Sequence, residues 1–140
     1  METYFQNMVE ELRQIRRDLH KIPELGLKEY KTSAYIREKL EGFGITELET
    51  WLETGVVAVI RGKGNKEAVA FRADMDALPV TEQTGCDFTS EHVGCMHACG
   101  HDGHMAMLLG AAKILKEHLF LIILEFRNFL LNLCTDHKYL

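Results

Sequence analysis

The chain has 140 residues, of which 46% are hydrophobic and 26% are charged, and its formal net charge is −5. This length and composition predict one globular domain with a hydrophobic core. The acidic balance, without a cluster of Lys and Arg, argues against a nucleic-acid partner, and the longest apolar run, residues 119–124, is too short to cross a membrane.

The N-terminus lacks the basic segment and apolar run that mark a secretory signal. Without such a signal, the four cysteines are better explained as free thiols than as a disulfide framework. These features predict a cytoplasmic protein with no membrane partner.

Two helices are predicted before the first strand. Residues 4–22 carry apolar side chains at three- and four-residue spacing, with Thr3 as a candidate N-cap and Pro23 after the last turn. Residues 29–41 predict a second helix. The side chains expected on its inner face are Ala34, Leu40 and either Tyr35 or Ile36.

The pattern then changes to that of strands. Residues 47–52 alternate loosely and predict an exposed edge strand, whereas residues 55–60 are β-branched and predict a buried strand. A turn at residues 61–65 leads to a second buried strand at residues 68–71. Together, residues 55–73 predict a β-hairpin.

A long loop and a third helix follow. Residues 74–98 show no sustained periodicity, and ordered loops of this length are often functional. The helical period returns from about residue 103, and the small residues at 110–112 allow a close approach to a sheet. The succession of elements predicts an α/β fold with a mixed sheet flanked by helices.

Two aspartates stand where the predicted strand meets the loop. Asp74 and Asp76 would share one side of a continuing strand, and two carboxylates so close repel each other unless a cation neutralises them. A metal ion is one such cation. The simpler alternative is that both aspartates cap a turn before Pro79.

Histidines and cysteines gather between residues 92 and 104. Cys99 and His101 flank Gly100 at the predicted start of the third helix, so the backbone can turn both donors toward one ion. Thiolate and imidazole bind zinc and similar metals, and Asp102 could bind the metal or fix an imidazole. The donors lack the paired spacing of a structural zinc finger.

The other histidines have simpler explanations. His92 and His118 are expected on the surface, and His20 is expected to complement the dipole at the end of the first helix. His104 is expected either as an ordinary first-turn residue or as a further donor beside His101.

Three stretches occur together in the order found in one family: residues 16–26 (RRDLHKIPELG), 71–79 (FRADMDALP) and 96–104 (MHACGHDGH). On these residues, the chain resembles the metal-dependent amidohydrolases that include N-acyl-amino-acid hydrolases, hippurate hydrolase and the indole-acetyl-amino-acid hydrolases of plants. These enzymes are relatives of aminoacylase and glutamate carboxypeptidase. The resemblance covers about residues 4–118.

The resemblance implies a zinc-exopeptidase-like fold and two divalent metal ions, commonly manganese, zinc or nickel. The family's cysteine and histidine ligands fall on Cys99 and His101. Asp76 falls on the aspartate behind the metal, and is the one candidate catalytic residue. Asp74 stands where the wider group has a histidine ligand, so Asp74, Asp102 and His104 are candidates for a supporting or ligand role. The stretch from Arg16 to His20 resembles a structural signature.

The resemblance also implies parts that this sequence lacks. Family members continue into a strand that ends in a glutamate pair, with the general base and another ligand, and they carry an inserted dimerisation domain. No Glu-Glu pair follows residue 104, so no general base is identified. We expect a partial catalytic domain at residues 1–118 and an apolar tail unlike the family at 119–140, as in a truncated product.

These observations predict a metal-dependent hydrolase of N-acyl amino acids, with weak or no activity in this chain. A homo-oligomer is compatible with the sequence, although the dimerisation domain is missing. The alternatives are a non-catalytic fragment of the family, a small metal-binding domain and, less well supported by the Cys-x3-Cys spacing, a thiol redox protein.

Overall fold

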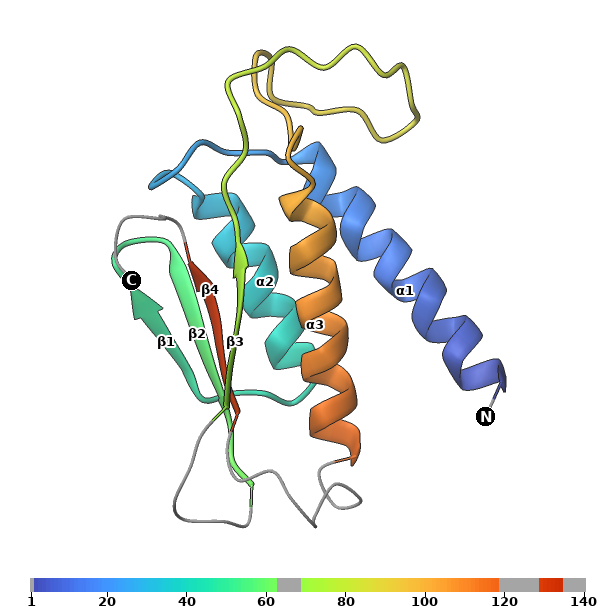
Figure 1. Cartoon of the computed structure of the whole chain (residues 1–140), viewed down its shortest axis with the longest axis vertical. Helices are drawn as coiled ribbons and strands as arrows, with labels where there is room; N and C mark the ends of the chain where they lie inside the picture. Colours follow the sequence, from blue (N-terminus) through green and yellow to red (C-terminus); the bar gives the residue numbers. More distant parts are fainter. Residues whose placement is uncertain (1, 63–68, 119–128, 135–140) are drawn as a thin grey trace.

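The computed structural model describes residues 2–62 and 69–118 together with the backbone of residues 129–134 (Figure 1). Most of the turn predicted at residues 61–65 and the apolar run at 119–124 lie outside the described residues. The elements in chain order are α1 (Glu2–Lys21), α2 (Tyr30–Gly42), β1 (Leu48–Trp51), β2 (Gly55–Ile60), β3 (Val69–Asp74), α3 (His101–His118) and β4 (Phe129–Cys134).

The four strands form one mixed sheet in the order β1-β2-β4-β3. β2 is antiparallel to both β1 and β4, whereas β3 runs parallel to β4. This arrangement confirms the predicted α/β class. The predicted hairpin of residues 55–73 is wrong, because β4 lies between its two strands: Leu131 is paired with Ala58 on one side and with Phe71 on the other.

The burial of the strands follows their position in the sheet. β1 is an exposed edge strand and β2 is buried, as predicted. β3 forms the other edge, and its residues 69–72 are exposed, so the prediction of a buried strand there is wrong. Only at its end does β3 enter the core, through Ala73, and Met75 directly after the strand is also part of the core.

Two helices pack directly on the sheet, and the third packs on one of these helices. α2 and α3 contact the strands, and α1 packs on α3 (Figure 1). Ile36 and Leu40 of α2 are buried as predicted, but Ala34 is exposed because it faces away from the core. Thr3 lies inside α1 and is therefore not its N-cap.

A close contact joins α1 to α3. A Cβ atom added at Gly110 would lie 2.8 Å from Cδ1 of Leu12, so this glycine allows the approach of α1. The small residues are predicted to allow a close approach to the sheet, but at Gly110 the close neighbour is α1. Ala112 belongs to the buried core with Met105 and Leu109.

The end of α1 and the start of α3 meet at one end of the molecule (Figure 1). The long loop after β3 covers this end. An isolated β-bridge joins its Ala77 to Leu25, and a second one, within the loop, joins Leu78 to Met96. This junction positions the candidate site. None of the helices in the described part of the chain has the length and apolar character needed to cross a membrane.

Candidate functional site

The loop-to-helix junction places Cys99 and His101 on either side of a sharp backbone turn. Gly100 has a φ of +81°, a left-handed conformation that favours glycine. His101 is the first residue of α3, and Cys99 is exposed in the loop before it. The exposed thiol and the partly exposed imidazole are therefore both accessible to an ion from solvent.

Asp76 fixes the imidazole ring of His101. The Nδ1 atom lies 2.9 Å from the backbone oxygen of Asp76 and 3.1 Å from its Oδ1 atom. A backbone carbonyl can only accept, so Nδ1 carries the hydrogen and donates it. In the neutral ring Nε2 then keeps its lone pair, which is the state in which an imidazole binds a metal.

Cys99 and His101 are donor types that bind metals, but two donors are fewer than a metal site usually has. A thiolate and an imidazole suit zinc and related ions, yet catalytic zinc sites usually have about three protein ligands. Among the described residues, no group of three or more His, Cys, Asp or Glu side chains is arranged to hold an ion. Cys99 and His101 alone therefore do not complete such a site.

Asp74 and His104 have other surroundings. Oδ1 of Asp74 lies 2.8 Å from an Nη atom of Arg72, so a cation of the chain itself compensates this carboxylate. His104 is exposed on α3, with its ring centroid 5.9 Å from that of His101. His104 thus lies next to the candidate ligand.

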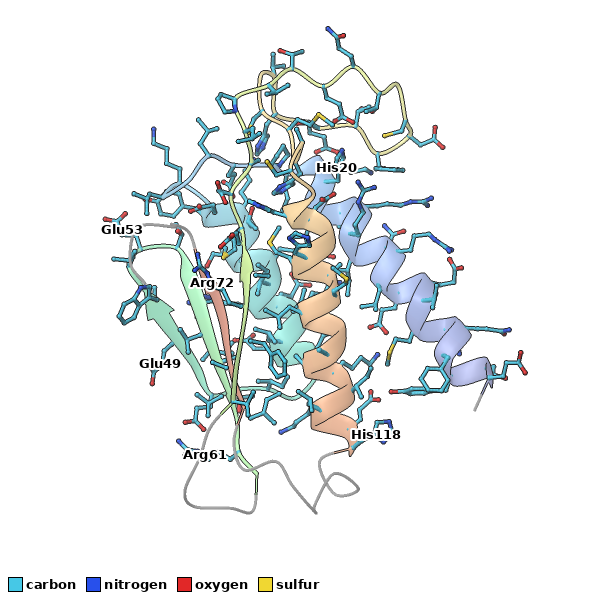
Figure 2. All side chains as sticks on the ribbon, viewed as in Figure 1. His20, Glu49, Glu53, Arg61, Arg72 and His118 are labelled. Carbon is cyan, nitrogen blue, oxygen red and sulfur yellow. The ribbon has the colours of Figure 1, made fainter. Side chains whose placement is uncertain are left out.

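Asp102 points to α1 and not to the imidazole of His101. Its side chain is 1% exposed, and Oδ2 lies 2.7 Å from both Nε of Arg16 and Nδ1 of His20. The other ring nitrogen of His20 lies 3.2 Å from Oε1 of Glu82. Figure 2 shows His20 at the end of α1, close to the start of α3.

The sequence alone does not predict this buried network. The expectation that His20 only complements the helix dipole is wrong, because its ring is 3% exposed and lies between two carboxylates. The spacing of Arg16 and His20, four residues apart on one helix face, was the available signal. Glu82 had none, because it lies in a loop without periodicity.

The charge of Glu82 is well compensated. Burial opposes its ionisation, but hydrogen bonds from the Thr84 hydroxyl, the Ser90 amide and His20 outweigh burial and lower the pKa of Glu82 to about 2. The Ser90 nitrogen lies 2.6 Å from Oε2. Glu82 is therefore a carboxylate over the whole neutral range, and it holds the loop to α1.

His97 is the most deeply buried imidazole near the junction. It is 3% exposed, and neither ring nitrogen has a hydrogen-bond partner among the described residues. Burial lowers the pKa of His97 to about 4, while the charge of Asp102 opposes this shift. The ring is therefore neutral near pH 7.

A cavity of about 440 Å³ opens beside Cys99. Its wall combines the end of α1 with the long loop, and includes Arg16, His20, Glu82, Phe88, His97 and Cys99. The guanidinium groups of Arg16 and Arg17 lie 5.1 Å and 5.0 Å from the centre of the Phe88 ring. A small polar molecule in this cavity would reach the candidate thiolate.

Comparison with known proteins identifies similar sequences. Residues 70–122 match the model of Peptidase family M20/M25/M40. The chain is 53% identical over 104 residues to the N-acetyl-L-cysteine deacetylase of Bacillus subtilis, covering 74% of this chain and 25% of that enzyme. It is 50% identical over 100 residues to an N-acetyldiaminopimelate deacetylase of Streptococcus gordonii, covering 69% of this chain and 26% of that enzyme.

A solved structure shares the fold. The YXEP protein of Bacillus subtilis, described as a dinuclear metal binding peptidase from the M20 family, superposes with a TM-score of 0.84 at 38% identity. The match covers 91% of this chain and 35% of that protein. The chain thus spans about a quarter to a third of the length of these relatives.

Proposed function

Because this chain belongs to Peptidase family M20/M25/M40, we propose that it carries part of the metal site of a hydrolase that cleaves the amide bond of N-acyl amino acids. Two similar enzymes are named as deacetylases of N-acetylated amino acids, and a similar structure as a dinuclear metal binding peptidase. The observation that carries the proposal is the contact of Asp76 with Nδ1 of His101, which leaves Nε2 for an ion.

In this proposal Cys99 and His101 are two ligands of a divalent ion, and manganese, zinc or nickel is the metal. Such an ion, when bound, supplies Lewis-acid polarisation of the substrate carbonyl. Asp76 keeps the proton on Nδ1 of His101 and so fixes the direction of Nε2. The charge of Asp74 is neutralised by Arg72. Asp102 forms its ion pair with Arg16 of α1.

The activity of this chain by itself is expected to be weak or absent. The ligand set is incomplete among the described residues, and no general base is identified. Loss of a general base alone lowers rates by about 10² to 10⁴. We further infer that residues 1–118 form the part of the catalytic domain present here, that residues 119–140 differ from the family in sequence although they contribute β4 to the sheet, and that the protein is cytoplasmic.

Bound metal per chain tests the proposal. We expect purified protein, incubated with manganese or zinc and then desalted, to retain metal, and Cys99→Ala to lose most of it. Cys86→Ala is the matched control, because Cys86 is a partly buried thiol of the same loop and should retain metal as the parent does. Equal metal content in the parent and Cys99→Ala, or none in a folded parent, would overturn the proposal.

An assay separates an enzyme from a non-catalytic fragment. N-acetyl amino acids and hippurate-like substrates are incubated with the protein and manganese, and release of the free amino acid is measured. Release that disappears in both Cys99→Ala and His101→Ala supports catalysis at this site. Metal retention without release supports a metal-binding fragment.

A further inference from the structure

We propose that Arg16, His20 and Glu82 act through Asp102 as positioning residues for His101 and Cys99. The role of the positioned groups as metal ligands rests on the function proposed above, whereas the positioning itself is a property of the protein without metal. These residues come from three segments that are distant in sequence: the last turns of α1, the loop after β3 and the first turn of α3.

The network is buried and closely spaced. Oδ2 of Asp102 accepts from both Arg16 and His20 at 2.7 Å, and His20 reaches Glu82 at 3.2 Å. His20 can donate to both carboxylates only when both of its ring nitrogens carry hydrogen. Arg16 also stacks over Phe88, with its guanidinium carbon 5.1 Å from the centre of the ring.

Removing one partner from this network is expected to lower the stability of the fold strongly. Oδ1 of Asp102 has no hydrogen-bond partner among the described residues, so Oδ2 makes all the observed contacts of this carboxylate. A buried carboxylate is desolvated whether or not it has partners, and its partners offset that unfavourable free energy. Removing one partner of a buried ion pair is therefore strongly destabilising. The start of α3 is therefore confined to the orientation in which Asp102 meets α1.

That orientation also sets the position of His101. Successive residues of an α-helix project about 100° apart around the axis. Asp102 is held by α1, and His101 is held by Asp76, which lies two residues after β3, so the first turn of α3 is fixed from two directions. Gly100 precedes this turn and by itself allows the backbone many orientations. The network removes that freedom for His101 and for Cys99.

The first test reads the tautomer of His101 in metal-free protein by long-range ¹H–¹⁵N NMR. In the parent we expect hydrogen on Nδ1 only. In His20→Gln and Asp102→Asn we expect a mixture of tautomers, because the ring leaves Asp76 for part of the time. Tyr35→Phe is the control: it removes the 2.8 Å hydrogen bond from Tyr35 to Asp18, between α2 and α1, outside the network.

The second test measures the affinity for cobalt by absorption titration of the same proteins. Loss of groups that support ligands typically weakens metal binding by about 10- to 100-fold. We expect this loss in His20→Gln and Asp102→Asn, and no change in Tyr35→Phe. If Asp102→Asn does not fold, Arg16→Gln replaces it, because the Arg16 side chain is 37% exposed and its loss is better tolerated.

The outcomes separate this inference from the proposed function. A tautomer shift in the network variants, with no cobalt binding by the parent, supports the positioning network and refutes the metal function. The positioning role is overturned if, in folded network variants, the hydrogen of His101 stays on Nδ1 and the cobalt affinity equals that of the parent. Circular dichroism and thermal unfolding establish which variants are folded.

Discussion

Two buried carboxylates show how surroundings decide the charge of a residue. Glu29 is fully buried and accepts hydrogen bonds from the Thr54 hydroxyl at 2.7 Å and from the Leu27 amide at 3.0 Å. Burial nevertheless dominates and raises the pKa of Glu29 above its usual value. At Glu82 the hydrogen bonds from Thr84, Ser90 and His20 win over burial, and the pKa falls.

Opposite pKa shifts predict opposite dependences of stability on pH. The lowered pKa of Glu82 contributes stability above its unfolded value of about 4.5, and this contribution is lost as the pH falls toward about 2. The raised pKa of Glu29 contributes stability at low pH, and that contribution is lost as the pH rises through the folded pKa.

Urea unfolding from neutral to acidic pH measures both effects. The stability difference between the parent and Glu82→Gln should shrink as the pH falls. The difference between the parent and Glu29→Gln should change in favour of the parent over the same range. Glu47→Gln is the control, because Glu47 pairs with Arg61 at the surface, where ion pairs contribute little to stability. Parallel pH profiles for Glu82→Gln and Glu29→Gln would contradict these assignments.

Residue types and spacing located the candidate ligands but not the network that holds them. Cys99 and His101 lie at a loop-to-helix junction as predicted, because their motif is local. The partners of Asp102 are in α1, far away in the sequence, and no local pattern reveals which distant side chain meets a buried carboxylate. The roles of Cys99, His101 and Asp76 at a metal stay predictions.

Single elements were predicted well where one face meets the core. Met8, Ile15 and Leu19 of α1 are buried as its apolar periodicity predicts, because the inward face of a helix repeats every three or four positions. Phe5 and Val9 of the same apolar stripe are exposed, as is Met107 of α3. β3 was misjudged because its apolar composition resembles that of a central strand. Its exposed edge position depends on the other strands of the sheet.

The contact between α1 and α3 gives a prediction at this scale. Gly110→Val should lower the free energy of unfolding by about 1–3 kcal/mol, because the added side chain overlaps with Leu12, whose Cδ atoms lie 2.8 Å and 2.9 Å from the new Cβ position. The same substitution in a Leu12→Ala background should cost much less, because the overlap is gone. Denaturant unfolding of the four proteins gives this coupling, and equal costs in both backgrounds would show that α1 does not approach here.

At the scale of the whole molecule, the sheet depends on a segment beyond the family match. The match to the family model ends at residue 122, whereas β4 spans Phe129–Cys134 and separates β2 from β3. The hairpin prediction failed because the pairing partner of both strands comes after α3. A short strand without alternating polarity gives little sign of where it inserts.

Proline in β4 tests this central position. In a strand with neighbours on both sides every amide faces one of them, so Leu131→Pro removes a hydrogen bond from the ladder. We expect a loss of at least about 1–3 kcal/mol, the cost of leaving a buried backbone partner unsatisfied, or loss of cooperative unfolding. Leu131→Val is the matched control, since valine suits a strand. Unchanged unfolding of Leu131→Pro would contradict a central β4.

The central claim is that Cys99 binds a divalent ion, and cobalt absorption tests it most directly. Cobalt bound to a thiolate gives a charge-transfer band in the near ultraviolet. We predict that the folded parent gains this band on titration, that Cys99→Ser lacks it, and that Cys86→Ser keeps it. A folded parent without the band at saturating cobalt, or an equal band in Cys99→Ser, would contradict the claim.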